Sequence, residues 1–314
     1  MRAVVFAYHN MGIVGLESLL AHGFDVPMVF SHADDPKENR WFGSVAELCR
    51  ARGIPVHLPE NVNLPSWPET IRAARPDLLF SFYYRAMLGR EILAVPRLCG
   101  MNLHGSLLPK YRGRAPVNWV LVKGETETGV SLHVMEEKPD AGDIVGQVAV
   151  PIAFEDTALT LYAKMERAAG RLLDELLPRI ARGEIPRRPN EIAKGSYFGG
   201  RRPEDGRIGW SKGATEIYNL VRAVARPYPG AFTTLGGERC LVWWAKPLDA
   251  GPHDSPLPPG RMRVEPRGPG GAPRVVVGTG SGALVLEEIE WRGRVAKGEE
   301  IAALLGREIQ GRFE

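Results

Sequence analysis

The first half of the chain alternates short apolar runs with amphipathic stretches. The apolar runs, which suit strands covered on both faces, are residues 4–8, 26–30, 55–58 and 78–83. Helical patterns lie between them, at residues 16–20, 45–52 and 67–74. Repeated strand–helix–strand units predict parallel strands joined by right-handed crossovers. We therefore expect a doubly wound, mainly parallel α/β sheet that binds its ligand at the carboxyl ends of its strands.

Gly12 and Gly15 follow the first apolar run and predict a turn before the first helix. This turn is either an anion site at a helix N-terminus or a plain strand-to-helix turn. Beyond it, the alternation continues to residue 182. The predicted elements there are a strand that runs into a turn at 100–109, a helix at 115–123, strands at 130–135 and 144–152, and an amphipathic helix at 157–182. A polar loop, residues 136–143, separates the last two strands.

The pattern changes after about Pro186, where short strand signals separated by turns predominate. These signals lie at residues 230–234, 240–244, 275–277 and 284–286. They predict a small β-barrel-like (OB-like) domain. We therefore expect an α/β catalytic domain at 1–188 and a β domain at 189–314. Within the latter, residues 247–273 hold 8 Pro and 5 Gly in 27 positions and predict a long exposed loop.

Composition narrows the class of protein. A chain of 314 residues with 44% hydrophobic and 25% charged residues has globular composition and room for two domains. No apolar run reaches about 18 residues, so no membrane helix is expected, and the N-terminus predicts a strand and not a signal peptide. Three widely spaced cysteines favour a reducing compartment, hence a cytoplasmic enzyme, and disfavour a thiolate zinc site. No metal site is expected.

The densest cluster of reactive side chains runs from Asn102 to Arg114. Asn102 and His104 are two residues apart on a predicted strand, so both side chains project from the same face. A histidine can move a proton while an asparagine amide stabilises an oxyanion, which suits acyl transfer. The alternative is a pair that only caps the turn after the strand.

A carboxylate from the loop 136–143 is the expected partner of His104. Asp140 would fix the tautomer of the imidazole and raise its pKa. Asp143, Glu136 and Glu137 compete for this role, and four acids within eight residues also suit a merely solvated loop.

Two of these segments resemble the signatures of the folate-dependent formyltransferases: 102–109, Asn-Leu-His-Gly-Ser-Leu-Leu-Pro, and 140–143, Asp-Ala-Gly-Asp. The spacing between them also matches. One branch is more similar still, the UDP-4-amino-4-deoxy-L-arabinose formyltransferases that form half of a bifunctional polymyxin-resistance enzyme. The segments that carry this likeness are 6–9, 80–85, 110–116, 124–130, 198–203 and 221–232.

The resemblance implies a formyltransferase-like Rossmann variant with named site residues. His104 would transfer the proton, Asn102 would stabilise the oxyanion, and Asp140 would tune the histidine. N10-formyltetrahydrofolate would be the co-substrate, and its contacts would be Ala86, Met87, Leu88, Arg114, Glu136, Glu137, Lys138, Pro139 and Asp140. Candidate contacts to the acceptor substrate are His9, Tyr84, Arg112 and Arg201. Four other histidines, His32, His57, His133 and His253, are interpreted as structural or exposed.

The resemblance implies transfer of a formyl group to the amine of a nucleotide-linked 4-amino sugar, UDP-4-amino-4-deoxy-L-arabinose, in lipid A and polymyxin-resistance sugar biosynthesis. A different UDP-linked or dTDP-linked amino sugar is an alternative. The decarboxylating dehydrogenase of that branch is not in this chain, so a separate partner enzyme that supplies this activity is one possibility. Assembly into a homo-oligomer is also open. A methionyl-tRNA formyltransferase is the main alternative. Its tRNA site needs excess positive charge, but residues 189–314 hold 18 Lys and Arg against 15 Asp and Glu, which disfavours nucleic acid. A non-enzymatic folate or nucleotide sensor is a third hypothesis.

One further motif has two interpretations. Residues 278–283 follow an apolar run and imitate the glycine pattern of a dinucleotide-binding turn. However, the apolar strand signal resumes directly after it and too little chain remains for a strand–helix–strand unit. We therefore expect a β-hairpin turn.

Overall fold

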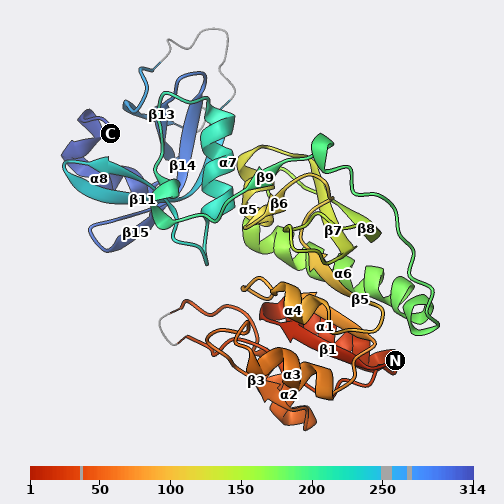
Figure 1. The fold of residues 1–314 in the computed structure, drawn as a ribbon. Coiled ribbons are helices and arrows are strands. Elements are labelled where there is room, and N and C mark those ends of the chain that lie inside the picture. The colour runs from red at the N-terminus through yellow and green to blue at the C-terminus, as the bar shows by residue number, and fades with distance from the viewer. Residues whose placement is uncertain (36–37, 249–256, 267–270) are drawn as a thin grey trace. The chain divides into compact units, whose positions relative to one another are not determined.

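The structure, a computed structural model, describes residues 1–35, 38–248, 257–266 and 271–314 (Figure 1). The chain forms two compact units. Unit 1 comprises residues 1–116, 127–152 and 162–199, and unit 2 comprises residues 117–126, 153–161 and 200–314. The expected domain boundary at 188/189 lies inside the last segment of unit 1 and remains a prediction.

Unit 1 is built on a seven-stranded sheet of order β3-β2-β1-β4-β5-β7-β8. Its strands are β1 (Ala3–Ala7), β2 (Val29–Phe30), β3 (Val56–His57), β4 (Leu78–Phe82), β5 (Cys99–His104), β7 (Glu127–Val134) and β8 (Ile144–Pro151). The first five in this order are parallel, whereas β7 pairs antiparallel with β5 and β8 antiparallel with β7. The mainly parallel doubly wound sheet is confirmed, and β1 lies at its switch point.

Helices cover both faces of this sheet. They are α1 (His9–Ala21), α2 (Val45–Arg52), α3 (Ser66–Ala73), α4 (Arg90–Leu93) and α6 (Ala158–Ala181), the last beginning in unit 2. On one face, Ile71 of α3 and Ile92 of α4 join a buried cluster with Phe6 and Leu79. The opposite face receives α1. Strands buried on both faces explain why the sequence shows continuous apolar runs.

The predicted turn at Gly12 and Gly15 is wrong, because both glycines lie inside α1, which begins at His9. A Cβ atom on Gly15 would come within 2.3 Å of the Phe82 ring, and one on Gly12 within 2.9 Å of Val45. The glycines therefore let the helix approach its neighbours closely, and they are not turn residues.

Unit 2 contains a six-stranded antiparallel sheet of order β10-β11-β14-β13-β12, with β15 beside β14. The strands are β10 (Ala231–Leu235), β11 (Glu238–Leu248), β12 (Met262–Pro266), β13 (Pro273–Gly278), β14 (Ala283–Trp291) and β15 (Arg294–Lys297). Two helices accompany them, α7 (Ala214–Val224) and α8 (Glu300–Leu305), and α5 (Pro116–Val122) starts at the end of unit 1 and continues in unit 2. The expected β-rich second domain is confirmed, although the sequence interpretation missed α7 and α8.

The loop expected at 247–273 is partly a strand. β12 lies within it and pairs antiparallel with β13, from Met262 opposite Val277 to Pro266 opposite Pro273. Pro266 is tolerated because it ends the strand. His253 and residues 249–256 and 267–270 lie outside the described residues. The turn after Gly278 joins two antiparallel strands, which confirms a hairpin and not a dinucleotide site.

Candidate active site

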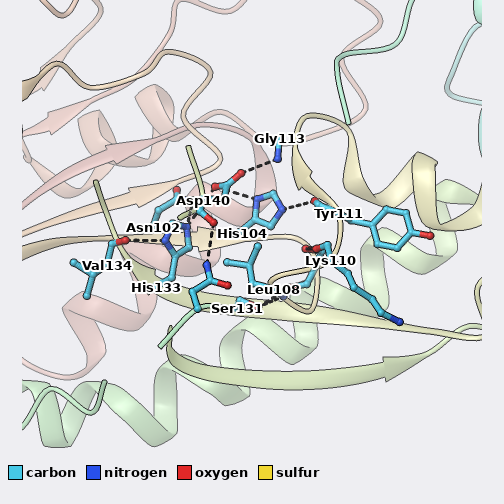
Figure 2. Close-up of polar contacts among 12 residues, drawn as sticks. Asn102, His104, Leu108, Lys110, Tyr111, Gly113, Ser131, His133, Val134 and Asp140 are labelled. Atoms are coloured by element: carbon cyan, nitrogen blue, oxygen red, sulfur yellow. Dashed lines mark hydrogen bonds and ion pairs between the residues drawn. The ribbon is translucent and has the colours of Figure 1, made fainter. Parts of the chain in front are cut away.

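Three predicted side chains meet at the carboxyl end of β5 (Figure 2). Asn102 and His104 lie at the C-terminal end of β5, and His104 is buried. Asp140 lies in the loop between β7 and β8 and adopts a left-handed backbone with φ of 50°. This is the edge of a parallel sheet at which α/β proteins bind ligands.

His104 is a neutral base held in one tautomer. Its Nε2–H donates to the backbone carbonyl of Tyr111 at 2.8 Å, which leaves Nδ1 as the accepting nitrogen, 3.5 Å from Oδ1 of Asp140. Burial lowers the pKa of His104, although Asp140 and the Tyr111 carbonyl act in the opposite direction. Asp140 thus raises the pKa of this histidine as expected, but desolvation outweighs the carboxylate, so the net pKa is lowered.

Asp140 is ionised at neutral pH. Burial favours its neutral form, but the imidazoles of His104 and His133 and the backbone N–H of Gly113 together hold its pKa well below the usual range. The Gly113 N–H donates to Oδ2 at 2.8 Å. The structure thus places Asp140 beside His104, whereas Glu136 and Glu137 are exposed and the carbonyl of Asp143 bonds to Val134.

His133, interpreted from the sequence as structural or exposed, is buried and belongs to this cluster. It stands directly opposite Asn102 in the antiparallel pairing of β5 with β7. Its Nε2 lies 3.1 Å from Nδ2 of Asn102 and 3.4 Å from Oδ1 of Asp140. The sequence offered one signal: a histidine on an apolar strand that precedes the Asp140 loop.

A hydrogen-bond network fixes the turn that follows His104. Ser131 on β7 accepts from the N–H of Leu108 at 3.1 Å and donates to the carbonyl of Ser106 at 2.6 Å. Gln147 on β8 donates to Ser131 at 2.7 Å and to the carbonyl of Leu108 at 2.9 Å. Since this turn leads to Tyr111, the network also positions the carbonyl that holds His104.

Residues 188–199, here called the strap, support the same turn and loop. Asn190 donates from Nδ2 to the carbonyl of Asp140 at 3.0 Å, and the N–H of Tyr111 donates to Oγ of Ser196 at 2.9 Å. The ring of Phe198 stacks on Tyr111 with centroids 5.1 Å apart. The strap carries β9 (Tyr197–Phe198), which pairs parallel with β6 (Arg112–Gly113). It is part of the site's framework, which the sequence interpretation missed.

The predicted folate contacts form two segments near this edge. Ala86, Met87 and Leu88 follow β4, and Asn63 holds their loop by donating to the Met87 carbonyl and accepting from Gly89. Met87 is 53% exposed, whereas Leu88 is buried in the core. The exposed residues Glu136, Glu137 and Lys138 precede Pro139, and Arg114 is exposed beyond Gly113. A hollow of about 220 Å³ beside Gly89 is lined by Asn63, Pro68, Gly89, Arg90, Glu91 and Ile92.

Three of the four predicted substrate contacts belong to unit 1, and Arg201 belongs to unit 2. Tyr84 stacks on His32 at 4.2 Å between centroids, and burial raises the pKa of its phenol to about 12. Arg112, in β6, lies over the ring of Tyr197. Arg201 belongs to unit 2, where its guanidinium lies 4.7 Å from the ring of Trp119. Their roles toward a substrate remain predictions.

His9, the fourth predicted contact, is enclosed by aromatic rings. It stacks on Phe42 and meets Trp41 and Tyr162 edge-on, and its Nδ1 lies 2.6 Å from the Tyr162 hydroxyl. With 9% of its surface exposed, the imidazole offers little area to a ligand. Burial, assisted by the positive charge of Arg85, lowers its pKa to about 3.

Replacing His9 with asparagine is expected to make the protein less sensitive to acid. In the wild type, the unfolded chain binds a proton near pH 6.5 but the folded chain only near 3, so stability is full above pH 6.5 and declines below it. At pH 5 the titration of this histidine should lower the free energy of unfolding by about 2 kcal/mol relative to pH above 6.5. Asparagine tolerates the left-handed backbone, φ of 66°, and does not titrate.

Urea unfolding at pH 7.5 and pH 5.0 measures this difference in free energy. The decrease between the two values should be smaller in His9→Asn than in the wild type. Tyr162→Phe is the control, because it removes the hydrogen bond but keeps the titrating imidazole. Equal decreases in His9→Asn and wild type would contradict the assignment.

Within the described residues, no group of three or more His, Cys, Asp or Glu side chains is arranged to hold a metal ion. The described helices also include none with the length and apolar composition needed to cross a bilayer.

Two family models match the chain. The model described as formyl transferase matches residues 15–177, and the formyl transferase C-terminal domain matches residues 201–304. Both catalytic segments predicted from the sequence, 102–109 and 140–143, fall within the first match.

Solved structures of similar fold include sugar N-formyltransferases. WlaRD, a sugar 3N-formyltransferase solved with dTDP and 5-N-formyl-THF, has a TM-score of 0.66 and 18% identity over 91% of this chain and 96% of its own. The N-formyltransferase from Helicobacter canadensis, solved with folinic acid and dTDP-3-aminofucose, has a TM-score of 0.65 and 20% identity over 95% and 98%. At these identities the likeness shows the fold.

A longer protein also contains this fold. HypX from Aquifex aeolicus, solved as a multiple variant, has a TM-score of 0.62 and 20% identity over 99% of this chain but 48% of HypX. This chain thus spans about half the length of HypX.

Proposed function

The chain belongs to the formyl transferase family, and we propose that it transfers the formyl group of N10-formyltetrahydrofolate to the amine of a nucleotide-linked sugar. One observation carries this proposal: the arrangement of Asn102, His104 and Asp140 at the carboxyl end of β5. The folate donor is supported by the folinic acid and 5-N-formyl-THF named with two solved relatives of the same fold.

The proposed reaction needs an oxyanion donor and a proton carrier. The acceptor amine attacks the formyl carbon, and the carbonyl oxygen becomes an oxyanion. This oxyanion accepts a hydrogen bond from the side-chain N–H of Asn102. His104 accepts the amine proton at Nδ1, where the resulting imidazolium pairs with Asp140. The proton then passes to N10 of the folate as the bond between the formyl carbon and N10 breaks. Tetrahydrofolate and the N-formyl sugar are the products.

A nucleotide sugar is the acceptor that the observations favour. Two solved relatives carry dTDP or a dTDP-amino sugar, and the sequence resembles the UDP-4-amino-4-deoxy-L-arabinose branch. Residues 189–314 carry an excess of three positive charges, from 18 Lys and Arg against 15 Asp and Glu. That is little for a tRNA substrate. We propose the UDP-linked 4-amino sugar of lipid A modification as the first acceptor to test, in a cytoplasmic setting.

The test offers the purified chain N10-formyltetrahydrofolate with one of three acceptors: UDP-4-amino-4-deoxy-L-arabinose, a dTDP-amino sugar, or methionyl-tRNA. Tetrahydrofolate release and the mass of the formylated product are measured. We expect turnover of the UDP sugar. Turnover of the dTDP sugar alone would correct the acceptor, and turnover of the tRNA alone would overturn the sugar proposal. Folate binding without any turnover would favour a sensor.

A further inference from the structure

We propose that His133 is a positioning residue that holds the Asn102 amide with its nitrogen correctly turned for the oxyanion. This inference rests on the proposed function, since it assigns a role within the same reaction. His133 touches no reacting atom in this assignment and acts through Asn102. The evidence is the tautomer of His133, its burial and its contact with Asn102, which Figure 2 shows.

The tautomer of His133 follows from its two hydrogen-bond partners. Nδ1 lies 2.8 Å from the carbonyl oxygen of Val134, which can only accept, so Nδ1 carries the proton. In the neutral ring, Nε2 is then an acceptor. A partner 3.1 Å from Nε2 must donate, so Asn102 presents its NH2 group and not its carbonyl oxygen. The histidine therefore decides which way round the amide lies.

This orientation has a direct consequence for the oxyanion. The amide nitrogen of Asn102 has two hydrogens, and His133 takes one of them. The second is available for the oxygen of the tetrahedral intermediate. Without His133, the amide can rotate by half a turn and present its oxygen instead, which would repel a developing negative charge.

The backbone makes the pair rigid. Asn102 and His133 are register partners in the β5–β7 pairing, so the two side chains leave the sheet opposite each other. The His133 side chain is 2% exposed, and water therefore cannot easily replace it as the acceptor. A donor fixed before the reaction needs no reorganisation when the charge develops, and this is the usual source of oxyanion stabilisation.

His133 also faces the carboxylate of Asp140, so it could instead affect the reaction through Asp140 and His104. Its Nε2 lies 3.4 Å from Oδ1 of Asp140, longer than its distance from Asn102. Asp140 in turn lies beside His104. If His133 acted through Asp140, its loss would change the protonation of His104 and move the pH profile. If it acts through Asn102, the pH profile stays in place and the rate falls.

The test compares His133→Leu with His133→Gln, using an acceptor that the wild type turns over. Leucine removes the acceptor, whereas the glutamine oxygen can occupy the position of Nε2 and accept from Asn102. We expect His133→Leu to lower kcat about 10- to 100-fold, because small displacements of a catalytic group have effects of this size. KM for the folate should change less than about twofold, and His133→Gln should recover most of kcat. His57→Leu removes a histidine of β3 whose ring is tilted against Phe30 of β2; it is the matched control and should keep wild-type kcat.

A double-mutant comparison shows whether His133 acts through Asn102 or through Asp140. In an Asn102→Ala background, His133→Leu should cost less than about threefold further, because its target is gone. An equal cost in both backgrounds, a shifted pH profile of kcat, or wild-type kcat in a folded His133→Leu protein would each overturn the proposal. Thermal melting confirms that each variant is folded. If the wild type itself turned over no acceptor, the proposed function would fail, and this outcome is distinct from a failure of the variants.

Discussion

Replacing His104 with glutamine is expected to lower kcat for formyl transfer by about two to four orders of magnitude, the usual contribution of a positioned proton carrier. Glutamine can still donate to the Tyr111 carbonyl, so the turn should keep its structure. It cannot accept and return a proton at the position of Nδ1. KM should change little, because the loss affects the transition state and not substrate binding.

Steady-state kinetics over pH 5 to 8 check this prediction. Because burial lowers the pKa of His104, the wild type should keep its kcat through neutral pH and lose it only below pH 6.5. His104→Gln should lack this acidic decline. His22 also lies beside a carboxylate, with Nε2 3.8 Å from Asp174, but at the far end of α1. His22→Gln is therefore the matched control and should retain full activity; a His104→Gln enzyme within threefold of wild type would contradict the mechanism.

Replacing Arg222 with alanine is expected to reduce the free energy of unfolding by about 3 kcal/mol, because it removes the hydrogen bonds and the packing of a buried guanidinium side chain. Arg222 lies on α7 and is 4% exposed. Its Nε donates to Oδ1 of Asn219 at 2.9 Å, and its Nη1 donates to the carbonyl of Ala153 at 3.1 Å. The same nitrogen lies 3.4 Å from the carbonyls of Phe154 and Asp156.

Urea unfolding of the purified protein measures this loss. Arg292→Ala is the control: its exposed guanidinium pairs with Glu238 at the surface, and its removal should leave the unfolding midpoint unchanged. Arg222→Met, which keeps the length of the side chain without its hydrogen bonds, should behave like Arg222→Ala. An Arg222→Met protein as stable as the wild type would show that packing, and not hydrogen bonding, is what this residue supplies.

The candidate catalytic residues of β5 could be placed together from the sequence because their spacing is local. Asn102 and His104 lie on one face of a strand whatever the rest of the fold does. The loop 136–143 offered four acidic residues, and only the resemblance to the formyltransferases singled out Asp140. His133 could not be assigned in this way. Its proximity to Asn102 depends on the antiparallel register of β5 with β7, and one residue of slip would turn its side chain to the other face.

The features that the sequence predictions missed or misplaced can also be explained physically. Gly12 and Gly15 suit a turn by propensity, but the lack of room beside Phe82 and Val45 is a tertiary fact that favours glycine inside α1. The net pKa of His104 depends on how deeply the folded protein buries it, which motif spacing does not reveal. The strap contains no reactive motif, and its importance lies in backbone and side-chain contacts with Tyr111 and Asp140.

The division of the chain between its units has a consequence for synthesis on the ribosome. Unit 2 includes residues 117–126 and 153–161, yet α7, which supplies Arg222 to the carbonyls of 153–156, begins only at Ala214. At about 5–20 residues per second, these early segments wait seconds for their partners. Until then the Phe154 ring lacks Tyr218 of α7, on which it stacks with centroids 4.5 Å apart, and the carbonyls of Ala153, Phe154 and Asp156 lack the Arg222 guanidinium. A chain released before α7 is complete therefore leaves these groups without their partners and should be less stable than the full chain, although it already contains the candidate residues His104 and Asp140.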